Sequence, residues 1–205
     1  MGIPGVLMRL SEGTSSTVLP LPGIAAIYTL RADDNEKPIA NTVYFLNDIS
    51  PLLSSRDQYD ADSDKHSDVS WIICSFINGR DAPGDEEPQI EPHKLPVPAA
   101  QGSVLVVNGS TPQSDKEADY HAWYDQEHGG KLTRVPGWTA ARRYALVKSY
   151  GPSQTASFYG FNFYKEENGL GGPEWQAGVT DWTLRIRSNA AKPNIRRVWE
   201  IVATQ

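Results

Sequence analysis

The sequence predicts an α+β fold of two ferredoxin-like (βαββαβ) units packed sheet to sheet, the first of which lacks its first helix. Three observations lead to this prediction: the order of strand and helix signals in the second half, a partial repeat of that order in the first half, and a proline-rich segment between them. At 205 residues the chain is long enough for one large domain or for two of about 100 residues each.

The second half carries the clearer pattern. β-Branched and aromatic runs between turn residues indicate strands, and a long amphipathic run indicates a helix. The strand signals lie at 103–108, 138–147, 157–164 and 197–202, with helix signals at 115–128 and 173–178. The order is therefore β, α, β, β, α, β, which is the split βαβ arrangement.

The first half repeats this order with one gap. Its strand signals lie at 5–10, 24–30, 41–46 and 70–77, with one helix signal at 50–59. Gly5 and Gly102 begin matching strands at an offset of about 97, whereas the Pro22-Gly23 and Pro136-Gly137 pairs differ by about 114. Roughly 17 residues, about the length of one helix, are therefore missing from the first copy.

The segment 82–101 separates the two halves. It holds Pro83, Pro88, Pro92, Pro96 and Pro98 among several acidic residues, and such a composition resists both helix and central strand. We therefore expect a degenerate ferredoxin-like half at 1–81, a linker at 82–101 and a complete half at 102–205.

The composition excludes several classes of protein. A net charge of −6 argues against a nucleic acid as partner, because binding to phosphate backbones depends on clustered Lys and Arg. No apolar run approaches the ~20 residues that span a bilayer, and the N-terminus lacks the pattern of a signal peptide. We expect a cytoplasmic protein without a membrane partner. The single cysteine, Cys74, lies in an apolar run and is expected to be a buried thiol.

The helix at 115–128 carries the strongest chemical signal. At 100° per residue, Tyr120, Trp123, Tyr124 and Glu127 fall in one stripe, with His128 at its edge. Tyr124 precedes His128 by one turn, so the two side chains can share a proton or bind one substrate oxygen.

A charged Glu127 beside His128 on a buried face requires a partner, because an unpaired buried charge is costly. Two interpretations stay open. In the first, the group binds a substrate and transfers protons. In the second, Glu127 pairs with Arg142 or Arg143 of the next strand, and His128 donates to a backbone carbonyl. The Gly129-Gly130 pair is expected to end the helix.

The run Asp119-Tyr120-His121-Ala122-Trp123-Tyr124-Asp125-Gln126-Glu127-His128, followed by Val135-Pro136-Gly137-Trp138 and Arg142-Arg143-Tyr144, resembles the EthD-like family, and in particular its fungal tandem members. This resemblance implies an intramolecular dimeric α/β barrel with a mostly apolar pocket between each sheet and its helices. It also implies a relationship to small cofactor-free enzymes that cyclise, decarboxylate, dehydrate or oxygenate polyketide-like substrates, and to proteins of no known activity. The helix histidine, here His128, would be the base or the substrate anchor.

The chain departs from the family pattern in two places. Gly129-Gly130 replaces the usual aliphatic-proline pair after the histidine. The first half lacks the aromatic helix altogether, so at most one of the two pockets can use this arrangement.

From these residues we predict one site. His128 would be the acid or base, Tyr124 would donate to a developing oxyanion, and Glu127 would orient one of them. Strand alternation places Trp138, Ala140, Arg142 and Tyr144 on one face and Arg143 on the other, so that one arginine faces the helices. The candidate substrate-binding residues are Trp123, Asn108, Arg142, Arg143, Tyr144 and Tyr159.

No metal or cofactor is expected. Asp60, Asp62 and Asp64 match the opening spacing of a calcium loop, but the glycine and the closing glutamate are missing. A solvated acidic loop is the favoured interpretation. His66, His93 and His121 are expected to be solvated or at a rim, and no phosphate-binding loop is present.

The leading functional hypothesis is a cofactor-independent biosynthetic enzyme, a cyclase or isomerase first and a decarboxylase or dehydratase second. Its substrate would be an apolar, oxygenated secondary metabolite such as a polyketide. The alternative is a non-catalytic protein that binds a hydrophobic small molecule, and a third possibility is a purely structural helix. The sequence leaves open a monomer with pseudo-dimeric halves or a homodimer.

Overall fold

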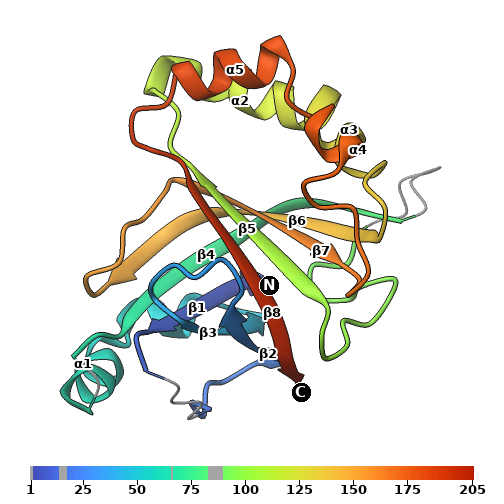
Figure 1. Cartoon of the computed structure of the whole chain (residues 1–205). Helices are drawn as coiled ribbons and strands as arrows, with labels where there is room; N and C mark the ends of the chain where they lie inside the picture. The colour runs from blue at the N-terminus through green and yellow to red at the C-terminus, as the bar shows by residue number, and fades with distance from the viewer. Residues whose placement is uncertain (1, 14–17, 66, 83–89) are drawn as a thin grey trace.

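Eight strands close into one antiparallel barrel in the order β1-β3-β2-β8-β5-β7-β6-β4. Figure 1 labels these strands and shows α2 and α5 side by side above the barrel. The structure, a computed structural model, describes residues 2–13, 18–65, 67–82 and 90–205. Among these residues no helix is long and apolar enough to cross a membrane.

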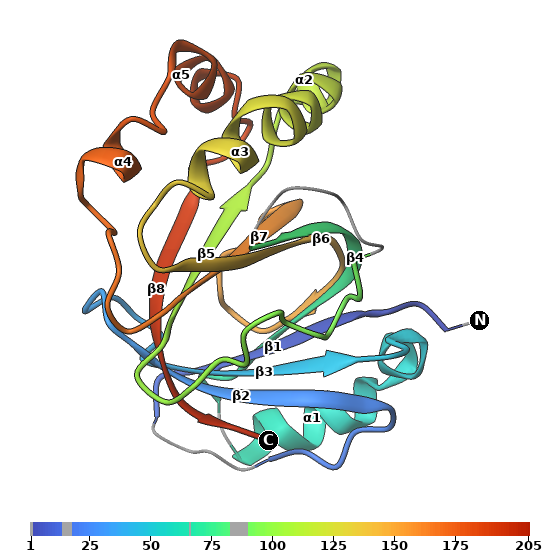
Figure 2. The same ribbon diagram turned by 90° about the vertical axis from the view of Figure 1, so that its right-hand side faces the viewer.

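The second half of the chain supplies one side of the barrel. Its strands are adjacent in the order β8-β5-β7-β6. They are β5 (Val104–Ser110), β6 (Trp138–Tyr150), β7 (Phe158–Tyr164) and β8 (Ile195–Thr204). The helices α2 (Glu117–Trp123), α3 (Gly129–Leu132), α4 (Pro173–Gln176) and α5 (Asp181–Ser188) lie together outside this part of the barrel (Figure 2).

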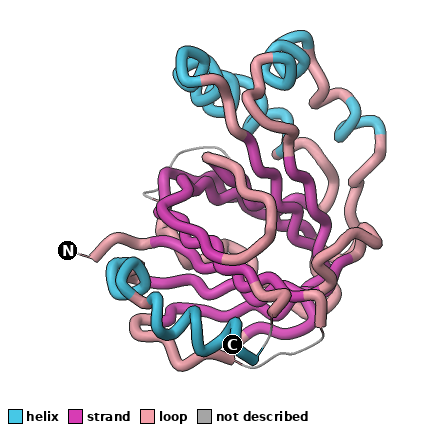
Figure 3. The backbone as a smooth tube through the Cα atoms, turned by 90° about the vertical axis from the view of Figure 1, so that its left-hand side faces the viewer, coloured by secondary structure: helices cyan, strands magenta, loops and turns pink. Residues whose placement is uncertain are grey.

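The first half supplies the other side, with its strands in the order β4-β1-β3-β2. They are β1 (Gly5–Ser11), β2 (Ile24–Ala32), β3 (Ala40–Leu46) and β4 (Ser70–Asp81). The helix signal at 50–59 becomes a short 3-10 turn, η1 (Ser50–Ser54), and the longer helix α1 (Arg56–Lys65). The described residues between β1 and β2 hold no helix, so α1 is the α-helix on this side of the barrel (Figure 3).

The two halves share one core. β2 pairs with β8 and β4 pairs with β6, so hydrogen bonds between strands close the barrel. Alternate side chains of all eight strands fill its interior, among them Leu30, Phe45, Ile72, Phe161, Phe163 and Trp199. The lone thiol, Cys74, is buried in this core as expected.

The outer face of the first half is packed with side chains. Arg9 lies almost fully buried there and makes two hydrogen bonds of 2.7 Å to the Asp62 carboxylate, which also accepts one from the Trp71 indole at 2.9 Å. The expected loop at Asp60, Asp62 and Asp64 is instead part of α1, which runs to Lys65. Asp60 and Asp64 are exposed as expected, but the expectation is wrong for Asp62, which is buried and neutralises a guanidinium. His66 lies outside the described residues.

The second part of the linker lies against one end of the barrel. The ring of His93 approaches Phe45 with a centroid distance of 6.2 Å, and Leu95 and Ala99 pack against the barrel core. Arg142 donates to the Lys94 carbonyl at 2.6 Å. The expectation that His93 is solvated is therefore wrong, since both of its ring nitrogens are buried.

Candidate functional site

The predicted helix is longer than expected and contains a π-helical turn. α2 continues through the π-helical segment η3 (Tyr124–His128) into α3, which ends at Leu132. Gly129 and Gly130 therefore lie inside the helix, and the prediction that they end it is wrong. A π turn closes with hydrogen bonds between residues five apart, and such turns occur frequently at functional sites.

This turn arranges three rings around one position. The His128 imidazole stacks on the Trp123 indole, five residues earlier, with a centroid distance of 4.2 Å and an interplanar angle of 18°. Tyr124 meets the imidazole edge to face at 5.6 Å. The predicted contact between Tyr124 and His128 is confirmed, and Trp123 holds the imidazole plane in place.

A cavity of about 150 Å³ adjoins these rings, between the helix, α5 and the outer face of β5 and β7. Its polar lining includes Asn108, Ser110, Tyr124, His128, Asn162 and Thr183, and its apolar lining includes Trp123, Leu132 and Ile186. A cavity of this size admits about one benzene-sized ring. The space therefore suits a small ring or one ring of a larger molecule.

Two polar atoms at this cavity lack partners. The Tyr124 hydroxyl and His128 Nδ1 are buried without a hydrogen-bond partner in the part of the chain that is described. Buried polar groups are nearly always satisfied in folded proteins, so atoms of this kind are candidates for contact with a ligand.

Burial sets the protonation state of both groups. It lowers the pKa of His128 to about 4, and the positive charges of Arg187 and Arg143 act in the same direction, against a backbone hydrogen bond with Gly178. Burial raises the pKa of Tyr124 to about 12, although the nearby Arg143 favours the ionised form. At neutral pH the site therefore offers a neutral imidazole as acceptor and a protonated phenol as donor.

In the described part of the chain Glu127 makes no ion pair with an arginine. Its carboxylate accepts a hydrogen bond of 2.5 Å from the Thr180 hydroxyl, and the same hydroxyl accepts from the Thr183 backbone at the start of α5. Glu127 thus connects the helix of His128 to α5. The second interpretation of the sequence is therefore wrong in pairing Glu127 with Arg142 or Arg143, whereas its other part, a backbone partner for His128, agrees with the hydrogen bond to Gly178.

The two arginines of β6 lie on opposite faces, and one faces the helices as predicted. The Arg143 guanidinium lies 4.2 Å from the centre of the Tyr124 ring and binds Asp125 and His121 Nδ1, each at 2.7 Å. Since Arg143 donates to His121 Nδ1, this histidine is an acceptor, and its partly exposed side chain agrees with the expected position at a rim. Arg143 holds Tyr124 from the side away from His128's cavity and lines a separate pocket.

Three other predicted substrate-binding residues lie in the barrel interior. Arg142 is fully buried and pairs with Asp81 at 2.6 Å, and Tyr144 and Tyr159 belong to the barrel core. The expectation that they help form the site of His128 is wrong, because alternation along β6 and β7 turns them away from the helices.

Trp138 also lies on the other face from the one predicted. A β-bulge between Trp138 and Ala140 shifts the register against β7, so that Trp138 packs with Leu132 and Ala141 beneath the helices. Simple alternation from Trp138 could not reveal this shift.

Sequence reasoning missed several residues of the cavity. Asn162 is buried, lies beside Tyr124 and accepts a hydrogen bond of 3.4 Å from the Trp138 indole. Its position one residue from Phe161 marks it as helix-facing, so alternation could have found it. Thr183 and Arg187 belong to α5, which was not predicted; Thr180 followed by Asp181 is a typical helix start and was the available signal.

Among the described residues no group of three or more His, Cys, Asp or Glu side chains converges as a metal site would require. The polar lining of the cavity consists of hydroxyl, amide and imidazole groups together with the two arginines Arg187 and Arg196.

Comparison with known proteins identifies the fold. No family model matches the chain, and no curated protein matches it. An anthrone oxidase-like protein of known structure is similar over 100% of this chain and 93% of its own, with a TM-score of 0.58 and 12% identity. A candidate monooxygenase of Fusobacterium nucleatum covers 100% of this chain and 94% of its own at a TM-score of 0.62 and 6% identity. A third structure, a candidate monooxygenase of Lactobacillus acidophilus, covers 98% of this chain and 95% of its own at a TM-score of 0.52 and 10% identity.

The fold is therefore an α+β fold with a closed eight-stranded antiparallel barrel, of the dimeric α/β barrel type seen in these neighbours. At 6 to 12% identity this likeness concerns the fold alone.

Proposed function

We propose that the protein is an enzyme that processes an apolar, oxygenated small molecule at the cavity beside His128, and that it does so by proton transfer without a cofactor. The observation that carries this proposal is the pair of unpartnered atoms, Tyr124 Oη and His128 Nδ1, at the wall of one cavity. Neutral His128 would accept a proton from the substrate, and Tyr124 would donate a hydrogen bond to the oxyanion that develops.

The proposal includes an interpretation of the fold. Each group of four adjacent strands has the order of a ferredoxin-like unit, so we interpret the chain as two such units, 1–81 and 102–205, joined by the linker 82–101. The EthD-like family remains the proposed relationship. In the first unit the outer face of the sheet is occupied by Arg9, Asp62 and Trp71, which bond to one another. The proposed site therefore belongs to the second unit.

The roles of the other residues follow from their contacts. Trp123 fixes the imidazole plane by stacking, and Asn162 and Asn108 offer amides to a substrate oxygen. Arg143, Asp125 and His121 position the Tyr124 ring from the opposite side. Glu127 is a positioning residue that acts through Thr180 and α5.

The first step can be tested without knowledge of the natural substrate. Acetophenone carries one ring, a carbonyl and exchangeable α-protons, so it suits a cavity of about 150 Å³. The full chain in D₂O should exchange these protons faster than buffer alone. His128→Ala should reduce the exchange by roughly 10²–10⁴-fold, the usual contribution of general acid–base catalysis, and Tyr124→Phe should also reduce it.

His93→Gln is the matched control, because it alters a histidine that packs against Phe45 at the end of the barrel and does not line the cavity beside His128. It should retain most of the exchange. Equal rates for wild type and His128→Ala would contradict a proton transfer by His128.

Two reactions could follow the proton transfer: cyclisation or isomerisation, and oxygenation. Cyclisation or isomerisation needs no oxidant. Oxygenation is favoured by the names of the structural neighbours, an anthrone oxidase-like protein and two candidate monooxygenases. Consumption of O₂ in the presence of a ketone that exchanges its protons would support oxygenation, and exchange without consumption would support the first candidate.

The alternative function, a binding protein for a hydrophobic small molecule, makes a different prediction. Phenol can donate to His128 Nδ1 and accept from Tyr124 at the same time. Saturable binding of phenol together with no acetophenone exchange would favour the binding protein.

A further inference from the structure

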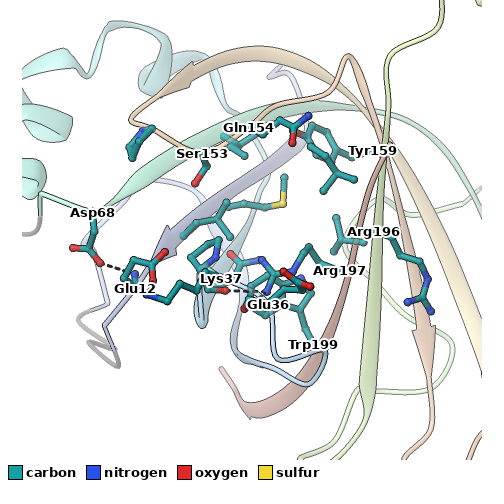
Figure 4. A pocket seen from close by; sticks show the side chains of 18 residues that line it. Glu12, Glu36, Lys37, Asp68, Ser153, Gln154, Tyr159, Arg196, Arg197 and Trp199 are labelled. Atoms are coloured by element: carbon teal, nitrogen blue, oxygen red, sulfur yellow. Dashed lines mark hydrogen bonds and ion pairs between the residues drawn. The ribbon is translucent and has the colours of Figure 1, made fainter. Parts of the chain in front are cut away.

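A second and larger cavity opens at one end of the barrel interior. Its volume is about 510 Å³, and Met8, Leu10, Ile72, Val107 and Trp199 provide much of its apolar wall (Figure 4). A volume of several hundred Å³ with mostly apolar walls is typical of small-molecule sites. The linker residues 90–101 pack at the other end, near Arg142 of β6 and Phe45 of β3, so this cavity has its own entrance.

One polar side chain of this cavity has no partner. Asn41 of β3 is 1% exposed and lines the cavity. Neither its Oδ1 nor its Nδ2 has a hydrogen-bond partner in the described part of the chain. Its neighbours on β1 and β2 in the strand register are Leu10 and Leu30, which are apolar. A fully buried carboxamide with both ends free is unusual and points to a missing ligand group.

The entrance is ionic but balanced. Lys37 pairs with Glu12 at 2.9 Å, and Arg197 pairs with Asp34 at 2.9 Å while its guanidinium covers the Trp199 ring at 4.3 Å. Glu36 and Asp68 also lie at the rim, as the labelled side chains in Figure 4 show. The charged lining residues are three carboxylates and three cations, Glu12, Glu36, Asp68, Lys37, Arg196 and Arg197, so their formal charges cancel and the entrance favours neither an anion nor a cation.

We propose that the barrel interior is a second ligand site, which binds a neutral, mainly apolar molecule whose edge carries a donor beside a carbonyl acceptor. Such an edge, as in a lactam or a carboxamide, matches the carbonyl and amino groups of Asn41 in one pair of hydrogen bonds. The site is distinct from the cavity beside His128, since Asn41 and Ile72 face the barrel interior and His128 lies outside it.

The test uses 6(5H)-phenanthridinone, a fluorescent three-ring lactam. The cavity beside His128 admits about one ring and cannot enclose all three rings of this probe, whereas the barrel interior has a volume of about 510 Å³. Titration of the full chain should give saturable binding. Asn41→Leu should weaken it about tenfold or more, because two hydrogen bonds are lost, and should leave affinity for phenanthrene, which lacks the polar edge, unchanged or improved.

The controls separate this site from the proposed active site. His128→Ala should leave lactam binding unchanged even if it abolishes α-proton exchange. Asn41→Leu should leave exchange unchanged. Its thermal midpoint without ligand should be equal to or above that of wild type, because leucine removes a buried amide that has no partner.

Asn41→Ser is a second, smaller substitution in case the leucine variant does not fold, and it should also weaken lactam binding. Absence of saturable lactam binding to wild type would overturn the proposal, since an internal water would then be the partner of Asn41. Equal lactam affinity in wild type and either folded Asn41 variant would overturn it as well.

Discussion

His128 is the residue on which the proposed chemistry depends, and its surroundings keep it neutral. The aromatic spacing of the sequence was enough to predict its contact with Tyr124. The low pKa could not be predicted from the sequence, because it arises from burial under α5 and from Arg187 on that helix. Likewise, alternation along β6 was enough to predict that Arg143 lies on the sheet face that meets the helices. Its hydrogen bonds to Asp125 and His121 depend on the path of the π turn and could not be predicted.

The lowered pKa of His128 predicts how stability changes with pH. In the unfolded chain this histidine has its ordinary pKa of 6.5, and in the folded protein its pKa is about 4. Between these values the unfolded state binds the extra proton, so the free energy of unfolding falls as the pH is lowered from 6.5 to 4. The loss from this residue is at most about 3 kcal/mol.

His128→Gln cannot take up this proton. Urea unfolding of wild type and variant at pH 7 and pH 4.5 should show a smaller loss of stability in the variant. Parallel losses in the two proteins would mean that His128 has the same pKa in the folded and unfolded states.

At the scale of elements, seven of the eight strands were placed within about three residues by β-branched runs and turn signals, and β4 extends further, to Asp81. The π turn was not predicted, because a single inserted residue leaves the aromatic pattern nearly unchanged. α5 was missed because it is only eight residues long and its apolar face is short. The bulge in β6 was missed because it moves Trp138 to the other face of the sheet without changing the residue types from which the strand was predicted.

The two glycines inside the helix give a matched pair of predictions. A methyl group at Gly130 would contact only the Arg80 guanidinium, at 3.6 Å, so Gly130→Ala should stabilise the protein by about 0.5–1 kcal/mol through the higher helix propensity of alanine. At Gly129 the same methyl would lie 3.0 Å from the Tyr124 carbonyl, which is backbone.

Gly129→Ala should therefore gain nothing or lose stability. Thermal midpoints of the two variants measure the contrast. Equal stabilisation by both substitutions would show that the π turn does not hold the Tyr124 carbonyl against Gly129.

At the scale of the whole molecule, the order of elements was sufficient to predict an α+β fold with two related halves. The prediction could not show that residues 90–101 pack against the barrel, since proline-rich composition describes what a segment cannot form rather than where it lies. Both halves enclose the same barrel interior, because β2 pairs with β8 and β4 pairs with β6.

A shared core predicts one cooperative unfolding transition. Cys74 is the single cysteine and lies buried in β4 of the first half, while five of the six tryptophans lie in the second half. Thiol labelling of Cys74 and tryptophan emission should therefore give the same urea midpoint. Reaction of Cys74 at clearly lower urea than the emission change would show that the first half unfolds separately.

The central claim is that a neutral His128 and a protonated Tyr124 act together on a substrate. The pH profile of acetophenone α-proton exchange tests it most directly, since the relevant pKa values are about 4 and about 12. After subtraction of the buffer rate, kcat/KM for exchange should be flat from pH 5.5 to about pH 9, and His128→Ala should remove this plateau. A profile that falls below an apparent pKa of about 6.5, or one that is the same in His128→Ala, would contradict the account.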